Sequence, residues 1–281
     1  MNSERELISI LSLVGDPDVG RLAVEQLREG REEAINSIEA IDNRSLYLND
    51  TLFASLMTEL KVGVAVDKLT EILKLPEPPL SRILFLLTKV ARPECDEVIW
   101  NDVLEDLILD LSLEISAEKT DIERIEIFNY LFFSRFMFNY DDSEIKCEDC
   151  ALIDRVLISR KGNPVVMSMI YFLLSRGVGL PVYPFCFPNG FIPAYVNDSG
   201  EIAFYMNVFD KGSIFYEERL KVVLKDLEVD GDIAGYVGDE RAVASIYIEM
   251  LLFLYENIQN FTKVSTLQPV RALVCGDKKY L

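Results

Sequence analysis

The stretch of sequence that decides the fold is LIDRVLISRKGNP, residues 152–164, followed at once by the apolar run VVMSMIYFLLSR, residues 165–176. Asn163 is a natural N-cap. Proline is well tolerated at the first helical position, because its missing N–H would have no intrahelical acceptor there. The pattern therefore predicts an apolar helix that begins at Pro164 and reaches Arg176.

Downstream of this helix the pattern changes to short aromatic and β-branched runs. They are VGLPVYPFCF (178–187), FIPAYV (191–196), residues 202–209 and residues 212–216, with the turn NDSG at 197–200. Such runs, separated by turn residues, are typical of strands and hairpins. We expect a small antiparallel sheet, followed by helices at about 217–227 and 239–261. The pattern assigns no structure to the stretch from Thr262 onward.

Upstream, the first third of the chain predicts one helix after another. The expected runs are 3–13 with a capping box at Ser3 and Glu6, 16–27, 33–41, 51–61, 65–74, 79–91 and 95–115. A second capping box, Thr120 with Glu123, leads into the aromatic stretch Phe128–Tyr140. The segment DPDVGRLAVEQL, residues 16–27, resembles the second-helix signature of HEAT-type repeats. No regular period follows, so the prediction is a HEAT-like helical region.

The composition excludes several classes of function. No histidine occurs among the 281 residues, which excludes Ser-His and Cys-His catalytic pairs and His-ligated metals within this chain. The formal net charge is −19, so the protein repels nucleic-acid backbones and anionic membranes. The first residues lack the pattern of a signal peptide, and most of the five cysteines are scattered. We therefore expect a reduced, cytoplasmic protein that binds neither nucleic acid nor membrane.

The motif CEDC, residues 147–150, has the spacing of metal and redox sites. One cysteine pair supplies only two of the four zinc ligands, so Cys95, Cys186 or Cys275 would have to complete the site. The acidic neighbours also disfavour a thiolate. Asp230–Asp232 lacks the later ligands of a calcium loop. We therefore expect incidental thiols, no metal and no cofactor.

One series of motifs is more specific than any of these. After residues 152–164 come GLPV (179–182), FPNGF (187–191) and NVFDKG (207–212). In this order and spacing the series resembles the SirB-type branch of the transglutaminase-like superfamily. The resemblance covers most of residues 1–216 and is sharpest at 152–212.

The resemblance implies a papain-like fold, in which a helix with a nucleophilic Cys at its start packs on a sheet that supplies His and Asp. The family's Cys position falls on Pro164, its His on Gly190 and its acidic residue on Asn207, so all three chemical roles are vacant. Ser168, one turn inside the helix, and Cys186, on a strand, could only stand in with a histidine to activate them.

The expected fold is α+β, with a helical HEAT-like region at residues 1–116. A transglutaminase-like domain with a small antiparallel sheet and C-terminal helices is expected at residues 117–281. If the resemblance holds, Pro164, Gly190 and Asn207 lie around one cleft, and water or a neighbouring aromatic ring, Tyr205 or Phe191, fills the space left at Gly190.

The expected function is that of a catalytically inactive transglutaminase-like protein, which binds or regulates an unidentified protein or peptide partner. Two alternatives stay open. One is a residual thiol hydrolase or acyl-transfer enzyme that uses Cys186 or a carboxylate pair. The other is a purely structural helical scaffold.

Overall fold

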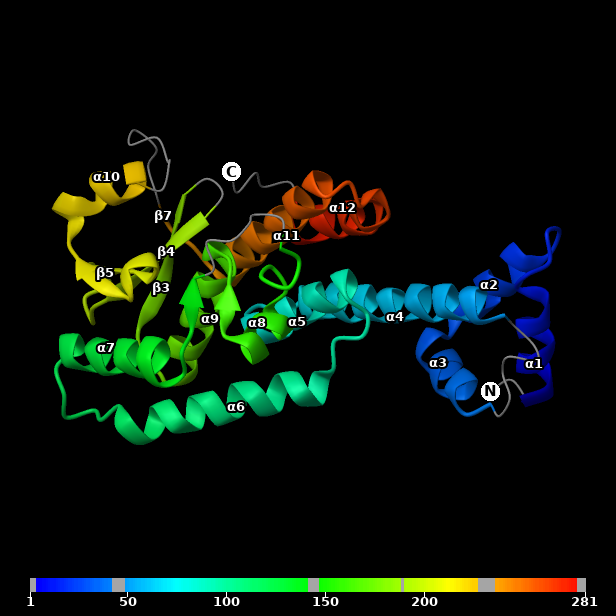
Figure 1. Cartoon of the computed structure of the whole chain (residues 1–281), viewed down its shortest axis with the longest axis horizontal. Coiled ribbons are helices and arrows are strands. Elements are labelled where there is room, and N and C mark those ends of the chain that lie inside the picture. Colours follow the sequence, from blue (N-terminus) through cyan, green and yellow to red (C-terminus); the bar gives the residue numbers. More distant parts are fainter. Residues whose placement is uncertain (1–3, 42–48, 141–146, 188–189, 227–235, 277–281) are drawn as a thin grey trace.

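Helices dominate the described chain, as the apolar periodicity predicts (Figure 1). A small five-stranded sheet and a two-stranded parallel pair lie among the later helices. The computed structural model describes residues 4–41, 49–140, 147–187, 190–226 and 236–276. The α-helices are α1 (Glu4–Leu13), α2 (Gly20–Glu29), α3 (Arg31–Glu39), α4 (Asp50–Ile72), α5 (Leu80–Ala91), α6 (Glu97–Glu114), α7 (Asp121–Asn129), α8 (Ile153–Ser159), α9 (Pro164–Gly177), α10 (Glu217–Asp226), α11 (Glu240–Asn257) and α12 (Phe261–Cys275). The other elements are the π-helix η2 (Tyr130–Arg135), the 3₁₀-helix η3 (Val208–Asp210) and the strands β1 (Asn139–Tyr140), β2 (Lys161–Gly162), β3 (Val182–Phe187), β4 (Gly190–Val196), β5 (Ile202–Asn207), β6 (Ser213–Phe215) and β7 (Tyr236–Val237).

The first three helices and the first half of α4 enclose a core of their own, at the blue end of the molecule in Figure 1. Its buried residues run from Leu7 to Leu60. The second helix begins at Gly20 and not at residue 16 as predicted. Asp16 stabilises the turn before it, because its carboxylate accepts hydrogen bonds from the N–H groups of Asp18 and Val19. The predicted capping box at Ser3 lies outside the described residues. The helical N-terminal region is therefore confirmed.

Helix α4 corrects one expectation, because the runs 51–61 and 65–74 form a single helix. A glycine inside a helix costs about 1 kcal/mol relative to alanine, which is why Gly63 suggested a break. In the structure the side chain of Arg31 crosses α4 where a Cβ at residue 63 would lie, and it pairs with Asp67 one turn on. Gly63 therefore permits a close approach between α3 and α4.

A second, larger core surrounds α9. It begins on α4 at Ala65 and includes buried residues of α5, α6, α8, α9, α11 and α12, together with one face of the sheet. The Tyr247 hydroxyl on α11 lies 2.9 Å from the Thr88 hydroxyl on α5 and accepts a hydrogen bond from the N–H of Ile153 on α8. The division between the cores therefore falls within α4, and the domain boundary at residue 116 stays a prediction.

The sheet has the strand order β6-β5-β4-β3-β7, and every neighbouring pair is antiparallel. The small antiparallel sheet is thus confirmed. Helix α9 packs on one face, where the ring of Phe172 meets that of Phe191. The other face carries a separate apolar cluster with Val223 and Leu224 of α10. Among the described helices, none combines the length and the apolar character needed to cross a membrane.

Two elements lacked a sequence signal. Strand β7 pairs with β3 through only two residues, which is too short for an alternating pattern. Helix α12 contains Pro269, a residue that usually ends a helix, yet it continues to Cys275 and packs against α11. The predicted capping box at Thr120 and Glu123 is confirmed. The aromatic stretch after it forms the end of α7, η2 and the short strand β1.

Several buried tyrosine and cysteine side chains have raised pKa values, so the protein should lose stability at alkaline pH. Burial raises the pKa of Tyr171 and Tyr247 above the ordinary tyrosine value, and it raises the pKa of the Cys95 thiol to about 12. These groups have higher pKa values in the folded protein than in the unfolded chain. The stability that this difference gives is complete below the unfolded-state pKa values of about 8.5 to 10. It is lost as the pH rises through the folded-state pKa values. Denaturant titrations should therefore give a free energy of unfolding that falls progressively above about pH 9.

The variant Tyr247→Phe removes one of these groups, so its alkaline decline should be shallower than that of the wild type. Tyr216→Phe is the matched control, because Tyr216 is 50% exposed, and it should keep the wild-type slope. Equal slopes for all three proteins would contradict this assignment.

Candidate functional site

The start of α9 is built as the sequence predicts. Asn163 is the N-cap, and its side-chain oxygen accepts a hydrogen bond from the N–H of Val166 at 2.9 Å. Pro164 is the first helical residue and needs no acceptor for a missing N–H. The N–H of Asn163 donates to the carbonyl of Cys150 at 2.8 Å, which ties the helix start to the preceding turn. The position to which the resemblance assigns the nucleophile is thus the first residue of a capped helix.

Gly190 is the first residue of β4 and pairs with Phe187 of β3. A Cβ at residue 190 would lie only 2.9 Å from Cε2 of the Phe187 ring, closer than two unbonded carbons normally pack. The ring beside the glycine is therefore Phe187, and the expectation of Tyr205 or Phe191 was wrong. Phe187 belongs to the apolar cluster on the α10 side of the sheet, whereas Phe191 faces α9. An imidazole at this position would meet Phe187.

Asn207 is the last residue of β5 and has a structural role of its own. Its side-chain oxygen accepts a hydrogen bond from the N–H of Phe209 at 3.1 Å and so caps η3. Its carbonyl accepts from the N–H of Gly212 at 2.8 Å. The amide cannot supply the negative charge that supports an imidazolium.

The structure brings some of these positions together. Gly190 and Asn207 lie at the same end of two neighbouring antiparallel strands. Asn207 is linked to the start of α9 through Tyr140, because Tyr140 pairs with Gly162 and its ring centroid lies 5.9 Å from that of Phe209. That all three triad positions line one cleft stays a prediction.

The two stand-in nucleophiles are both buried. Ser168 is 3% exposed inside α9. Cys186 is 2% exposed on β3. Burial raises the pKa of the Cys186 thiol to about 12, and the carboxylate of Asp239 adds to this increase. Since the thiolate is the reactive form, this geometry opposes a nucleophilic role for Cys186 near neutral pH.

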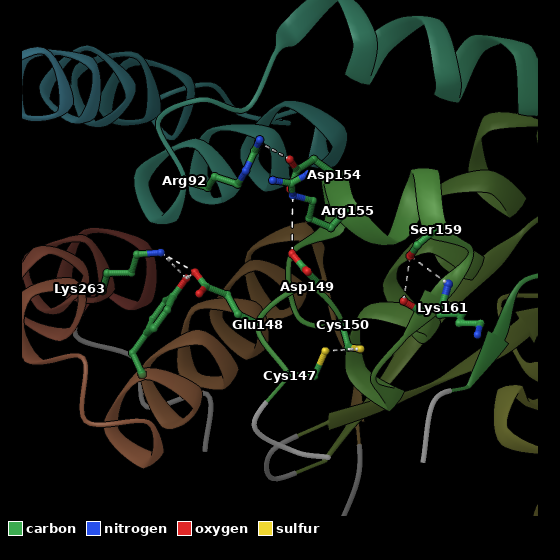
Figure 2. Close-up of polar contacts among 11 residues, drawn as sticks. Arg92, Cys147, Glu148, Asp149, Cys150, Asp154, Arg155, Ser159, Lys161 and Lys263 are labelled. Carbon is green, nitrogen blue, oxygen red and sulfur yellow. Dashed lines mark hydrogen bonds and ion pairs between the residues drawn. The ribbon is translucent and has the colours of Figure 1, made fainter. Parts of the chain in front are cut away.

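An ion pair joins α8, the helix that precedes α9, to the end of α5. Arg92, at the end of α5, donates to Asp154 at 2.6 Å, as Figure 2 shows. Burial raises the pKa of Asp154 above its usual range, and Arg92 offsets part of that effect. A pocket of about 180 Å³ lies beside this pair, lined among others by Trp100, Val103 and Ile158. The enzyme alternative requires two carboxylates side by side. Asp154 is paired with an arginine instead, so it does not form such a carboxylate pair.

The turn at residues 147–150 is also fixed by charged groups (Figure 2). Glu148 accepts hydrogen bonds from the Tyr255 hydroxyl at 2.9 Å and from the Lys263 ammonium group. Burial opposes ionisation of Glu148, but these two hydrogen bonds together with the positive charges of Lys263 and Arg155 outweigh it and hold the pKa of Glu148 below its usual value. The turn is thereby tied to α11 and α12.

Sequence reasoning missed these partners. Asp154 stands within the stretch that decides the fold, but its partner Arg92 is 62 positions earlier. Lys263 is 115 positions after Glu148, in a region that carries no readable pattern. Such pairings need the tertiary arrangement. Within the described part of the chain, no group of three or more Cys, Asp or Glu side chains could hold a metal ion, and Asp230–Asp232 lies outside that part.

Comparison with known proteins gives one family. Residues 100–232, a little under half of the chain, match the model of the transglutaminase-like superfamily. A UPF0162 protein of Vibrio cholerae is 31% identical over 139 residues, which cover 49% of this chain and 50% of the relative. Protein SirB1 of Salmonella typhimurium is 27% identical over 147 residues, covering 52% and 54%. A UPF0162 protein of Xylella fastidiosa is 22% identical over 168 residues, covering 60% and 57%.

The chain therefore spans about half the length of the curated relatives it matches. No solved structure matches it significantly.

The contact between Gly190 and Phe187 can be tested by a double-mutant cycle. Gly190→His should lower the free energy of unfolding by about 1–3 kcal/mol, because the side chain overpacks against the Phe187 ring. In the background Phe187→Ala, which removes that ring, the same change should cost clearly less. Chemical denaturation of the four proteins measures the coupling. Additive effects would show that Phe187 does not restrict this position.

Proposed function

Because residues 100–232 match the transglutaminase-like superfamily and the similar proteins include SirB1 and UPF0162 proteins, we propose that this protein is a catalytically inactive member of the SirB-type branch that acts by binding a partner. The observation that carries the proposal is the state of the histidine position. The residue at this position is Gly190, and the ring of Phe187 crowds it. The chain contains no histidine that could act in its place. Pro164 has no nucleophilic side chain, Asn207 carries no negative charge, and no histidine is present to act as the base, so these positions cannot carry out acyl transfer.

The binding role is supported by the outward face of α6, which runs along one edge of the molecule (Figure 1). Large apolar side chains are exposed on this face: Val98 is 66% exposed, Leu109 60% and Leu113 75%. At helical spacing they share one side of the helix, while Trp100, Leu104, Leu107 and Leu111 are buried on the other. Exposed apolar groups gathered on one helix face are typical of interaction surfaces.

The charge of α6 indicates what kind of partner it takes. Helix α6 carries acidic residues and no basic ones. Three of its acidic side chains, Asp102, Glu105 and Asp106, are exposed between the apolar ones. Within the described residues, no lysine or arginine forms an ion pair with these three, whereas Glu97, Asp110 and Glu114 each have an arginine. The face therefore fits a basic amphipathic helix of a partner protein, and a second copy of this acidic face would be repelled.

The proposal also includes the type of each part of the fold and the cellular location. We take the N-terminal helices as HEAT-like and the second core as papain-like, with α9 as the helix that carries the nucleophile in active members. We propose a cytoplasmic location, because mostly scattered cysteines without a disulfide framework are typical of a reducing compartment. Nucleic acid and anionic membranes are poor partners for a net charge of −19.

Inactivity is tested with a glutamine-containing peptide and a primary amine, by following ammonia release and amine incorporation. The wild type should give no turnover above the buffer rate, and the matched variant Cys186→Ser should be indistinguishable from it. Turnover that Cys186→Ser abolishes would support the thiol enzyme instead. Turnover that survives in Cys186→Ser would point to a carboxylate pair.

The binding face is tested by calorimetry with a synthetic amphipathic peptide of leucine and lysine as the probe. Glu105→Lys with Asp106→Lys should weaken its binding at least tenfold, and added salt should weaken binding to the wild type. The control Glu29→Lys with Glu33→Lys makes the same charge change on exposed residues of α2 and α3 and should bind as the wild type does. Equal loss in both double variants would show unspecific attraction and remove the α6 assignment, leaving the scaffold alternative.

A further inference from the structure

The turn that precedes α8 holds two thiols in near contact. The Sγ atoms of Cys147 and Cys150 lie 2.7 Å apart, as Figure 2 shows. The N–H of Cys150 donates to the carbonyl of Cys147 at 3.2 Å, which closes the four residues into a turn. A disulfide bond has an S–S length of about 2.05 Å, so bond formation needs only a small further approach.

We propose that Cys147 and Cys150 form a redox-active dithiol, which closes to an intramolecular disulfide by exchange with a small disulfide such as oxidised glutathione. This inference does not depend on the proposed function, because it uses other residues and another reaction. It replaces the expectation of incidental thiols that the sequence alone suggests.

The exchange takes place in two steps. A thiolate of the pair attacks one sulfur of oxidised glutathione, forming a mixed disulfide and releasing one glutathione thiolate. The second thiol of the pair then loses its proton and attacks the protein sulfur of the mixed disulfide, releasing the second glutathione thiolate. Two protein thiols are oxidised, one glutathione disulfide is reduced to two glutathiones, and the two protons end on the released thiolates. Cys147 is the more exposed of the two and reacts first.

The acidic neighbours, which argue against a thiolate in the sequence, are balanced in the structure. Glu148 is held by Lys263 and by the Tyr255 hydroxyl. Asp149 lies 3.7 Å from the guanidinium of Arg155. Both carboxylates within the turn, Glu148 and Asp149, therefore have a cation beside them. The local charge around Cys147 and Cys150 is much closer to neutral than the letters CEDC suggest.

The other described thiols lack this arrangement. Cys95 and Cys186 are 1% and 2% exposed, respectively, and burial raises the pKa of each to about 12. Cys275 is the last residue of α12 and is not part of the turn. Near neutral pH, exchange should therefore select the pair at residues 147 and 150.

Closing the pair would act on the start of α9. The carbonyl of Cys150 accepts the hydrogen bond from the N–H of Asn163, and Asn163 caps the helix through Val166. A disulfide restricts the backbone of its own turn. The amide protons of Asn163 and Val166 should therefore exchange more slowly with solvent in the oxidised protein than in the reduced one.

The test incubates the native full chain with oxidised glutathione near neutral pH and follows it by non-reducing mass spectrometry. The expected result is the loss of two hydrogen masses and a peptide map that joins residue 147 to residue 150. Cys150→Ser should stop at a mixed disulfide on Cys147, whereas Cys186→Ser should oxidise like the wild type. In denaturant the preference for this pair should disappear.

Three results would overturn the proposal. They are oxidation at other cysteines in the native protein, resistance of the native protein to a large excess of oxidised glutathione, and an equal rate in native and denatured protein. The wild-type map decides between these results even if a variant folds poorly. Unchanged exchange at Asn163 and Val166 would remove the coupling to α9.

Discussion

The burial of α9 is the constraint on which the rest of the structure depends. From Val166 to Ser175 every side chain of this helix is buried, so the helix needs neighbours on all sides. Helices α6, α8 and α11 and strands β3 and β4 all contact it. Its polar groups are satisfied within the core, as the Tyr171 hydroxyl donates to Asn129 at 2.7 Å. The order of the later elements follows from the need to surround this one helix.

A helix placed in this way keeps its position whether or not it carries a nucleophile. In an active enzyme the first turn of such a helix stabilises a thiolate. Here Asn163 and Pro164 use the same turn for capping, and Asn207 caps η3 instead of supporting an imidazolium. Asn163 and Asn207 thus use their side chains to cap backbone N–H groups. Capping of this kind holds the helix start and the end of β5 in place without any reactive group.

Local signals made much of the fold predictable, and long-range ones did not. Some features depend only on residues that are adjacent in the sequence, so the sequence predicts them well. They are the caps at Thr120 and Asn163 and the aromatic runs of β3 to β5. The close approach of Arg31 to α4 at Gly63 comes from another helix and has no local signal. The residue types at positions 164, 190 and 207 could be read from the sequence, but the crowding of Gly190 by Phe187 required the pairing of two strands.

Helix α4 has a mechanical consequence. Its 23 residues span roughly 35 Å at a rise of 1.5 Å per residue, and one continuous ladder of backbone hydrogen bonds joins Leu60 in the first core to Ala65 in the second. The described chain has no flexible linker between these two residues to absorb a rotation. A torque applied to the first three helices is therefore transmitted by α4 to the packing around α5. The orientation of the N-terminal helices is a fixed property of the molecule.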